Sequence, residues 1–322
     1  MADRPTVLVT RKLPKAVESK LAETYDVRLN VDDRLYTADE LIEKSQGVDA
    51  ILPCHSEHFT ADVVSKLPDS VKIVANFSVG YDHCDTEAFK ARGIVVTNTP
   101  DVLSDATAET AMLCMLGAAR RAGEGERMMR DGSWSWWSPA FMVGKGVTGK
   151  TLGIVGMGRV GQVFAKRAAA AFDMTVLYHN RSKLDTASEN GAEFVADLND
   201  LLARADIVSL HCPNTPATKG LMNAKTLGLM KPGSILVNTA RGAIVDEPAL
   251  IHALQKGPLF AAGLDVYCTE PGGNPDLAAL PNTFLLPHIG SANEETRDAM
   301  GYRAIANLDA FFAGNPPEDR VI

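Results

Sequence analysis

The chain has no run of apolar residues near the roughly 20 that a helix needs to cross a bilayer. Its first ten residues, MADRPTVLVT, have no long apolar core, so we expect neither a secretory signal nor a membrane partner. Cysteine is scarce, and its five scattered positions do not form a disulfide framework, which favours a reducing cytoplasm. These positions are Cys54, Cys84, Cys114, Cys212 and Cys268.

Positive charge is outnumbered, with 32 Lys and Arg against 40 Asp and Glu, for a formal net charge of −8. This balance argues against a nucleic-acid partner. A small anionic substrate stays compatible with it, because local positive groups can outweigh a diffuse negative surface.

Metal-ligand spacing is also missing. His55 and His58 lie beside Cys54, but their spacing is poor and nothing downstream completes a ligand set, so we expect no metal. Cys84 and Cys268 have no adjacent base in the sequence, which argues against a cysteine nucleophile.

Short β-branched segments alternate with longer helical patterns through both halves of the chain, whose 322 residues suit two domains. This alternation predicts α/β domains with mostly parallel sheets and helices on both faces. We predict strands at 6–10, 27–29, 50–53, 72–76 and 94–98, and then at 151–155, 174–178, 192–195, 207–211, 234–238, 261–266 and 283–286. Predicted helices include 38–45, 86–92, 104–121 and 293–313.

The helix predicted at 104–121 is rich in Ala, Met and Leu and has few charges before its end. We therefore expect it to be buried on more than one side, between domains or between subunits. A loop dense in Gly, Ser and Trp follows at 132–146. The first half of the chain has no glycine-rich turn after its first strand, so nothing there is suited to a phosphate.

The second half opens with the strand TLGIV, the turn Gly156-Met157-Gly158-Arg159-Val160-Gly161 and a helical pattern. This GxGxxG sequence has the required context of strand, turn and helix. Its first glycine permits the turn, the second lets the backbone approach a pyrophosphate, and the third allows close helix packing. The helix N-terminus adds N–H groups and a positive dipole end, so we predict a dinucleotide site.

The end of the next strand, TVLYH, indicates which dinucleotide is preferred. An NAD site has an Asp or Glu there for the ribose 2′-hydroxyl, but this strand runs into Asn180, Arg181 and Ser182. Asp173 lies before the strand, at its wrong end. Asn180 does not repel a 2′-phosphate, and the planar cation of Arg181 suits phosphate oxygens. We therefore expect NADP(H), with NAD(H) as the alternative.

Three polar side chains follow late strands of the second half. Arg241 comes after SILVNTA, Glu270 after AAGLDVY and His288 after TFLLP. A guanidinium can hold a carboxylate and polarise a keto oxygen, and histidine, with an unperturbed pKa of about 6.5, suits proton transfer. A glutamate beside the histidine would stabilise the imidazolium. Together they predict a 2-keto acid reductase.

These segments carry a family resemblance. GMGRVG, NTARGAIVDEPAL, GLDVYCTEP and LLPHIGSA resemble the signature segments of the D-isomer-specific 2-hydroxyacid dehydrogenases. In that family the Arg binds substrate, the His is the acid/base and the Glu pairs with the His. The resemblance assigns these roles to Arg241, His288 and Glu270.

The resemblance also implies a fold of two Rossmann-like domains with an interdomain cleft: a flavodoxin-like substrate domain and an NAD(P)-binding Rossmann domain. The substrate domain would be discontinuous, residues 1–99 plus 289–322, with the cofactor domain at 100–288. Family members are usually dimers through the cofactor domain, so a homodimer is expected.

Further site residues follow from the resemblance. Val79 and Gly80 would offer N–H groups to the substrate carboxylate, and Asp265 would lie near the nicotinamide. The predicted cofactor set comprises Thr107, Gly156, Gly158, Arg159, Val160, Gly161, Asn180, Arg181, Ser182, Cys212, Pro213, Thr218, Thr239, Ala240, Arg241, Asp265, His288 and Gly290.

Within the family, the Trp-rich loop and YHNRS are similar to those of glyoxylate and hydroxypyruvate reductases. Phe141 matches an aromatic position that reaches the partner subunit's substrate site, although other members carry Trp there, and dimer packing alone is the alternative. We expect NADPH-dependent reduction of glyoxylate or hydroxypyruvate. The alternatives are another dehydrogenase of the family (phosphoglycerate, D-lactate or phosphite type) or a dinucleotide-sensing binding protein like the C-terminal-binding-protein corepressors. A formate type is disfavoured, because it has Gln where Glu270 stands.

Overall fold

The computed structural model describes residues 4–322. By its internal contacts the chain divides into two compact units: unit 1 runs to Leu103 and resumes at Ala292–Ile322, and unit 2 is Ser104–Ser291. The sequence placed these boundaries at 99/100 and 288/289. Leu103 packs against the core of unit 1. The N–H groups of Ile289 and Gly290 donate to Asp265 of unit 2. These contacts explain why each boundary lies a few residues later than the sequence placed it.

Unit 1 contains five strands and five helices among the described residues. The strands are β1 (Thr6–Val9), β2 (Asp26–Leu29), β3 (Ala50–Leu52), β4 (Ile73–Ala75) and β5 (Val95–Thr97). The helices are α1 (Lys15–Thr24), α2 (Ala38–Lys44), α3 (Ala61–Lys66), α4 (Thr86–Arg92) and α13 (Glu294–Phe312).

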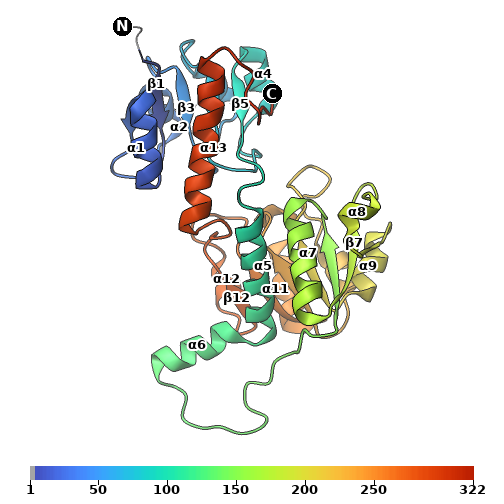
Figure 1. The fold of residues 1–322 in the computed structure, drawn as a ribbon. Helices are drawn as coiled ribbons and strands as arrows, with labels where there is room; N and C mark the ends of the chain where they lie inside the picture. The colour runs from blue at the N-terminus through green and yellow to red at the C-terminus, as the bar shows by residue number, and fades with distance from the viewer. Residues whose placement is uncertain (1–3) are drawn as a thin grey trace. The chain divides into compact units, whose positions relative to one another are not determined.

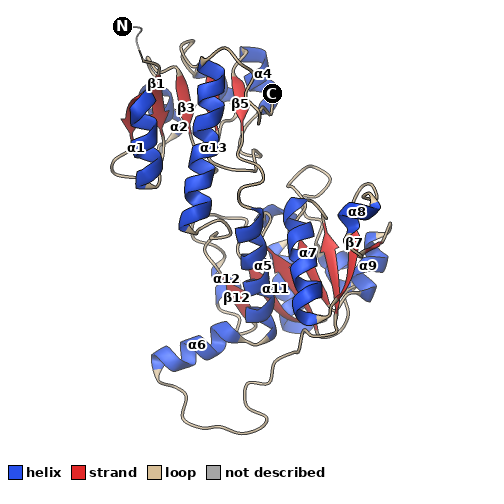
Figure 2. Ribbon diagram, viewed as in Figure 1, coloured by secondary structure: helices blue, strands red, loops and turns tan. Residues whose placement is uncertain are grey.

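All strand pairs of unit 1 are parallel, in the order β2-β1-β3-β4-β5. This order is that of flavodoxin-like sheets. One face of the sheet packs with α1 and α13, and the other with α2, α3 and α4 (Figures 1 and 2). A Cβ on Gly301 of α13 would lie 2.3 Å from Val17 of α1, so the last helix of the chain is fitted closely to the first.

Unit 2 contains seven strands: β6 (Thr151–Val155), β7 (Thr175–His179), β8 (Glu193–Phe194), β9 (Ile207–Leu210), β10 (Ser234–Asn238), β11 (Leu259–Leu264) and β12 (Thr283–Leu285). Its α-helices are α5 (Ser104–Ala119), α6 (Ala122–Asp131), α7 (Arg159–Phe172), α8 (Thr186–Glu189), α9 (Leu198–Arg204), α10 (Ala224–Gly228), α11 (Glu247–Lys256) and α12 (Pro275–Ala278). A short 3-10 helix, η1, spans Gly242–Ile244.

The sheet of unit 2 is parallel throughout, in the order β12-β11-β10-β9-β6-β7-β8. The six strands from β8 to β11 follow the order of a dinucleotide-binding Rossmann fold, in which the strand order reverses beside β6. Helices α5 and α7 cover one face, and α9, α10 and α11 cover the other (Figure 2). All seven strands therefore end at one edge, which we call the carboxyl edge.

Helix α5 is buried within its own unit. A Cβ on Gly263 of β11 would lie 2.3 Å from the backbone oxygen of Cys114, and a Cβ on Gly117 would lie 2.6 Å from the Phe284 ring. These contacts place α5 tightly against β11 and β12. Leu113, on the same helix, is 48% exposed.

The sequence analysis did not predict α6. The chain turns at Arg121, whose φ is 55°, and α6 then leaves the body of unit 2 at the edge opposite the carboxyl edge (Figure 1). No residue of α6 is buried, although the start of the helix lies beside Thr283 and Phe284 of β12. Among residues 4–322, no helix is both long and apolar enough to cross a membrane.

Candidate active site

The glycine-rich turn follows β6 with the geometry its sequence predicts. Gly156 has φ +96°, and a Cβ there would lie 2.4 Å from the backbone of Cys212. A Cβ on Gly161 would lie 2.5 Å from the Gly156 oxygen, so this glycine lets α7 approach the strand. A Cβ on Gly158 would meet nothing within 4 Å, and no described side chain caps α7 there. The helix N-terminus thus opens onto space suited to a pyrophosphate.

Asn180 follows β7 and supports this turn. Its side-chain oxygen accepts the N–H of Met157 at 2.7 Å, a contact that the sequence did not reveal. The next two residues, Arg181 and Ser182, are exposed. In the described part of the chain, the Arg181 guanidinium has no hydrogen-bond or ion-pair partner, so its cation faces solvent.

Other predicted cofactor residues surround the turn. Cys212 and Pro213 follow β9, and the Thr218 hydroxyl donates to the Pro213 oxygen at 2.6 Å. This hydroxyl also accepts the N–H of Thr215, so it stabilises its own loop. The hydroxyl of Thr239, after β10, is buried without a hydrogen-bond partner among residues 4–322. A buried hydroxyl without a hydrogen-bond partner, beside the carboxyl edge, indicates that a ligand group would form the missing hydrogen bond.

Arg241 lies on a turn after β10 that Asn238 stabilises. The Asn238 side chain accepts the N–H of Ala240 at 3.0 Å and donates to the oxygen of Arg241 at 2.9 Å. Asn238 is 1% exposed, so a buried side chain holds the geometry of this turn. The Arg241 guanidinium is half-buried and donates to the oxygen of Ala240 at 2.8 Å.

Glu270 and His288 are paired directly. The His288 Nδ1 lies 2.5 Å from Glu270 Oε2, and the two side chains are 27% and 25% exposed. Glu270 Oε1 accepts the N–H of Tyr267 at 2.7 Å, so both carboxylate oxygens are used. A carboxylate on Nδ1 fixes the orientation of the ring and leaves Nε2 available to a ligand.

Asp265 follows β11 and holds the segment after His288. Its two oxygens accept the N–H groups of Ile289 and Gly290 at 2.7 and 2.8 Å. Burial raises the pKa of Asp265, while these two N–H groups oppose that rise. Thr107 of α5 lies beside the same segment, because a Cβ on Gly290 would be 3.6 Å from its hydroxyl. His288 itself has a left-handed backbone, with φ 54°.

The loops that carry these groups meet at the carboxyl edge. A Cβ on Gly242 would lie 1.9 Å from the carbonyl carbon of Tyr267, so the Arg241 turn is in direct backbone contact with the Glu270 loop. The Tyr267 hydroxyl donates to the oxygen of Leu286 at 2.9 Å, which links the same loop to the end of β12. Unit 2 therefore places a cation, a His–Glu pair and a glycine-rich turn along one edge.

Val79 and Gly80 lie in unit 1, after β4, and their carbonyl groups are anchored. Asn98 donates to the Val79 oxygen at 2.8 Å, and the Ser78 hydroxyl donates to the Gly80 oxygen at 2.7 Å. Their N–H groups have no hydrogen-bond partner within residues 4–322. Two N–H groups held in this way can bind a carboxylate.

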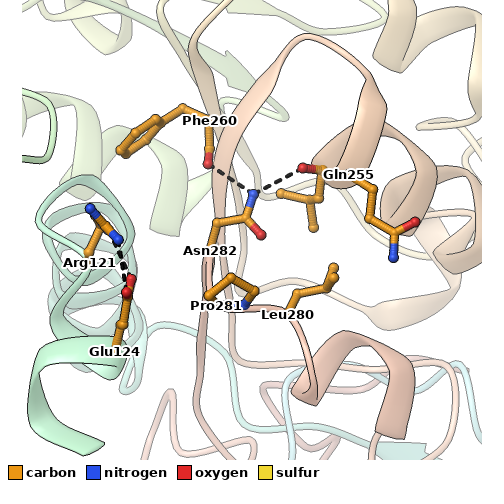
Figure 3. Close-up of a pocket in the computed structure, with 8 residues that line it drawn as sticks. Arg121, Glu124, Gln255, Phe260, Leu280, Pro281 and Asn282 are labelled. Atoms are coloured by element: carbon orange, nitrogen blue, oxygen red, sulfur yellow. Dashed lines mark hydrogen bonds and ion pairs between the residues drawn. The ribbon is translucent and has the colours of Figure 1, made fainter. Parts of the chain in front are cut away.

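Phe141 is not brought to the carboxyl edge of its own chain. It lies in the loop after α6, with its ring centroid 4.8 Å from that of Trp136. This loop and α6 extend from the opposite edge of unit 2 (Figure 1). The cavity drawn in Figure 3 also lies at that opposite edge, between Arg121 and Glu124 on one side and Gln255, Phe260 and Asn282 on the other.

The sequence analysis missed the residues that hold the site together. Asn238 and Tyr267 contact predicted site residues, and Glu247 contacts the loop that carries Glu270, but none of the three was assigned a role. Asn238 had a usable signal, because an Asn at the end of a buried strand, three residues before a candidate Arg, suits a side-chain-stabilised turn. The hydroxyl of Tyr267 and the carboxylate of Glu247 contact segments distant in the sequence, so these contacts have no local signal.

Comparisons with known proteins agree with this geometry. Residues 112–290 match the family model described as D-isomer specific 2-hydroxyacid dehydrogenase, NAD binding domain. The chain is 44% identical over 311 residues to glycerate dehydrogenase of Hyphomicrobium methylovorum, covering 96% of both chains. It is 42% identical over 323 residues to glyoxylate reductase of Thermococcus litoralis, covering 99% of this chain and 97% of that one.

Among solved structures, the chain is similar to an NADPH-dependent glyoxylate/hydroxypyruvate reductase from Sinorhizobium meliloti in complex with NADP and malonate. The TM-score is 0.85 and the identity 34%, and the match covers 99% of this chain and 97% of the other. Identity at this level over nearly the whole length, together with the paired His and Glu beside a glycine-rich turn, establishes the relationship. The chain belongs to the D-isomer specific 2-hydroxyacid dehydrogenases.

Proposed function

We propose that this chain is a glyoxylate/hydroxypyruvate reductase that prefers NADPH, with NADH as the alternative cofactor. The observation that carries the proposal is the Glu270–His288 pair, which lies on the same edge of unit 2 as the Arg241 turn and the glycine-rich turn. The names of the relatives support the substrate class, since glycerate is the 2-hydroxy acid formed when hydroxypyruvate is reduced.

The cofactor proposal rests on three features of unit 2. The open N-terminus of α7 suits the pyrophosphate, the buried hydroxyl of Thr239 lacks a partner, and the cation of Arg181 faces solvent after β7. Asn180 is neutral and stands directly after β7, so no carboxylate at that position repels a 2′-phosphate. The reduced nicotinamide, when bound, supplies the hydride for the keto carbon.

In this proposal His288 donates a proton to the keto oxygen of the substrate as that oxygen gains negative charge. Glu270 holds the imidazole by Nδ1, so Nε2 is the proton-donating atom. The guanidinium of Arg241 binds the substrate carboxylate and polarises the carbonyl. For unit 1, we propose that the N–H groups of Val79 and Gly80 bind the carboxylate.

A homodimer through unit 2 is part of the proposal. Helix α6 has no buried residue, and Trp136 and Trp137 of the loop beyond it are 58% and 71% exposed. Exposed apolar surface of this kind is typical of a protein interface. Phe141, which packs against Trp136, would then reach the substrate site of the partner subunit. We also propose a cytoplasmic location.

The test is a panel of 2-keto acids, followed by the loss of reduced nicotinamide absorbance with NADPH and with NADH. We expect the highest kcat/KM for glyoxylate and hydroxypyruvate with NADPH. His288→Ala should lower kcat by about 100-fold or more while NADPH still binds, because it removes the proton donor. Activity restricted to large, branched or phosphorylated acids would contradict the substrate proposal, and unchanged turnover in His288→Ala would contradict the assigned donor.

A further inference from the structure

One carboxylate outside the predicted site, that of Glu247, contacts both ends of the loop that carries Glu270. Its Oε1 accepts the N–H of Cys268 at 2.7 Å, and its Oε2 accepts the side-chain amide of Asn274 at 2.8 Å. The two oxygens therefore close residues 268–274 at their base. Hydrogen bonds to an ionised carboxylate are about twice as strong as neutral ones, so this closure is firm.

The same loop is attached to the strand that leads to His288. Tyr267, directly before it, donates its N–H to Glu270 Oε1 at 2.7 Å and its hydroxyl to the oxygen of Leu286 at 2.9 Å. Within the loop, the N–H of Gly273 donates to the oxygen of Thr269 at 3.0 Å. A shift of the loop would therefore move the Glu270 carboxylate relative to the His288 ring.

Glu247 also links this loop to the segment of Arg241. It lies in the first turn of α11, and only η1 and Val245-Asp246 separate it from the Arg241 turn. Cys268 Sγ donates to the oxygen of Val245 at 3.7 Å, beside the close backbone contact of Gly242 with Tyr267. Glu247 is thus the charged group by which the substrate-binding segment holds the acid/base loop.

We infer that Glu247 is a positioning residue for the proposed reaction, holding the Glu270 loop so that Glu270 fixes the His288 ring. This inference rests on the proposed function. It gives Glu247 no contact with substrate or cofactor, because both carboxylate oxygens are occupied by the loop. Loss of the carboxylate should leave binding intact and slow the step in which His288 donates its proton.

Two variants and a matched control test the inference. Glu247→Ala removes both hydrogen bonds, whereas Glu247→Gln keeps an acceptor for the N–H of Cys268 and loses the carboxylate that faces Asn274. Asp246→Ala is the control, because Asp246 caps the same turn of α11 through the N–H of Ala249 and, within residues 4–322, makes no side-chain hydrogen bond to the Glu270 loop.

For Glu247→Ala we expect kcat with glyoxylate and NADPH to fall about 10- to 100-fold, with KM for NADPH within about twofold of the wild type. The solvent deuterium isotope effect on kcat should rise, because proton donation becomes more rate-limiting. Glu247→Gln should lie between the wild type and Glu247→Ala, and Asp246→Ala should match the wild type. Active enzyme is counted by the stoichiometry of NADPH binding, so partial unfolding is not mistaken for slow chemistry.

An unchanged kcat and isotope effect in Glu247→Ala, or equal losses in Glu247→Ala and Asp246→Ala, would overturn the inference. If Glu247→Ala does not fold, Glu247→Gln decides by the same two measurements. Amide hydrogen exchange of residues 267–274 gives a readout without substrate: faster exchange in Glu247→Ala than in Asp246→Ala supports the inference, and equal exchange overturns it. Wild-type enzyme that reduces no 2-keto acid would refute the proposed function, while this exchange measurement would still decide the role of Glu247.

Discussion

Single side chains at the carboxyl edge of unit 2 differ in how strongly their neighbours fix them. Glu270 and Asp265 each use both carboxylate oxygens within the protein, whereas the guanidinium of Arg181 has no partner in residues 4–322. A group with satisfied hydrogen bonds keeps its geometry before a ligand arrives. A solvated cation at a loop is instead suited to bind an anion, and this difference underlies the proposed preference for NADPH.

Arg181→Ala should therefore weaken NADPH and spare NADH. We expect KM for NADPH to rise about 10-fold or more, because a phosphate loses a charge-assisted partner, with KM for NADH within about twofold of the wild type. Steady-state rates with each cofactor at saturating glyoxylate provide the measurement. Lys183→Ala, in the same loop but paired with Glu189 at 3.6 Å, is the control. Equal losses for both cofactors in Arg181→Ala would refute the phosphate contact.

At the scale of elements, close packing between α5 and the sheet maintains the shape of unit 2. The sequence predicts α5 from its apolar composition, but not which neighbour covers it. The two glycines, Gly117 and Gly263, decide this, because each lets helix and strands approach where a methyl group would collide. Helix α6 was not predicted because its sequence, AGEGERMMRD, contains two glycines, which are weak helix formers, and few apolar residues.

Gly263→Ala should lower the free energy of unfolding by about 1–3 kcal/mol, because its methyl group would collide with the backbone oxygen of Cys114. Urea unfolding followed by circular dichroism measures the change. Gly146→Ala is the control, since a Cβ there meets nothing within 4 Å. A Gly263→Ala protein as stable as the control would show that α5 does not pack on β11 at this distance.

At the scale of the whole chain, two parallel sheets with separate cores form from one sequence pattern. His211 follows β9, beside the glycine-rich turn, and packs against Phe164 in the core of unit 2. Its ring lies 5.5 Å from that of Phe164, and Nε2 lies 2.8 Å from the Ser209 hydroxyl. Burial lowers the pKa of His211 to about 4, because the charged imidazolium loses its hydration there.

The stability of the molecule should consequently fall in mild acid. The unfolded chain protonates His211 near pH 6.5, whereas the folded chain protonates it only near pH 4. The contribution of His211 to the free energy of unfolding is therefore complete above pH 6.5 and is lost as the pH falls toward 4. Urea unfolding at pH 7.5, 6, 5 and 4.5 should show a smaller loss of stability in His211→Gln than in the wild type. Parallel curves for the two proteins would contradict a neutral imidazole in the folded chain.

The sequence by itself determined the alternation of strands and helices, the glycine-rich turn and the three side chains at strand ends. These features follow from local rules, because neighbouring residues determine the periodicity of apolar side chains, the turn type and the ends of strands. The family resemblance implied that the C-terminal helix belongs to the first domain; α13 lies in unit 1 and packs against α1.

Only the tertiary structure decided how Glu247 closes the Glu270 loop, how Asn180 supports the glycine-rich turn and how Gly242 abuts Tyr267. Each of these contacts joins residues from different loops, separated by 21 to 27 positions in the sequence, which meet only after the sheet has formed its strand order. No local pattern encodes such a contact, because it exists only when parallel strands bring their carboxyl ends to one edge.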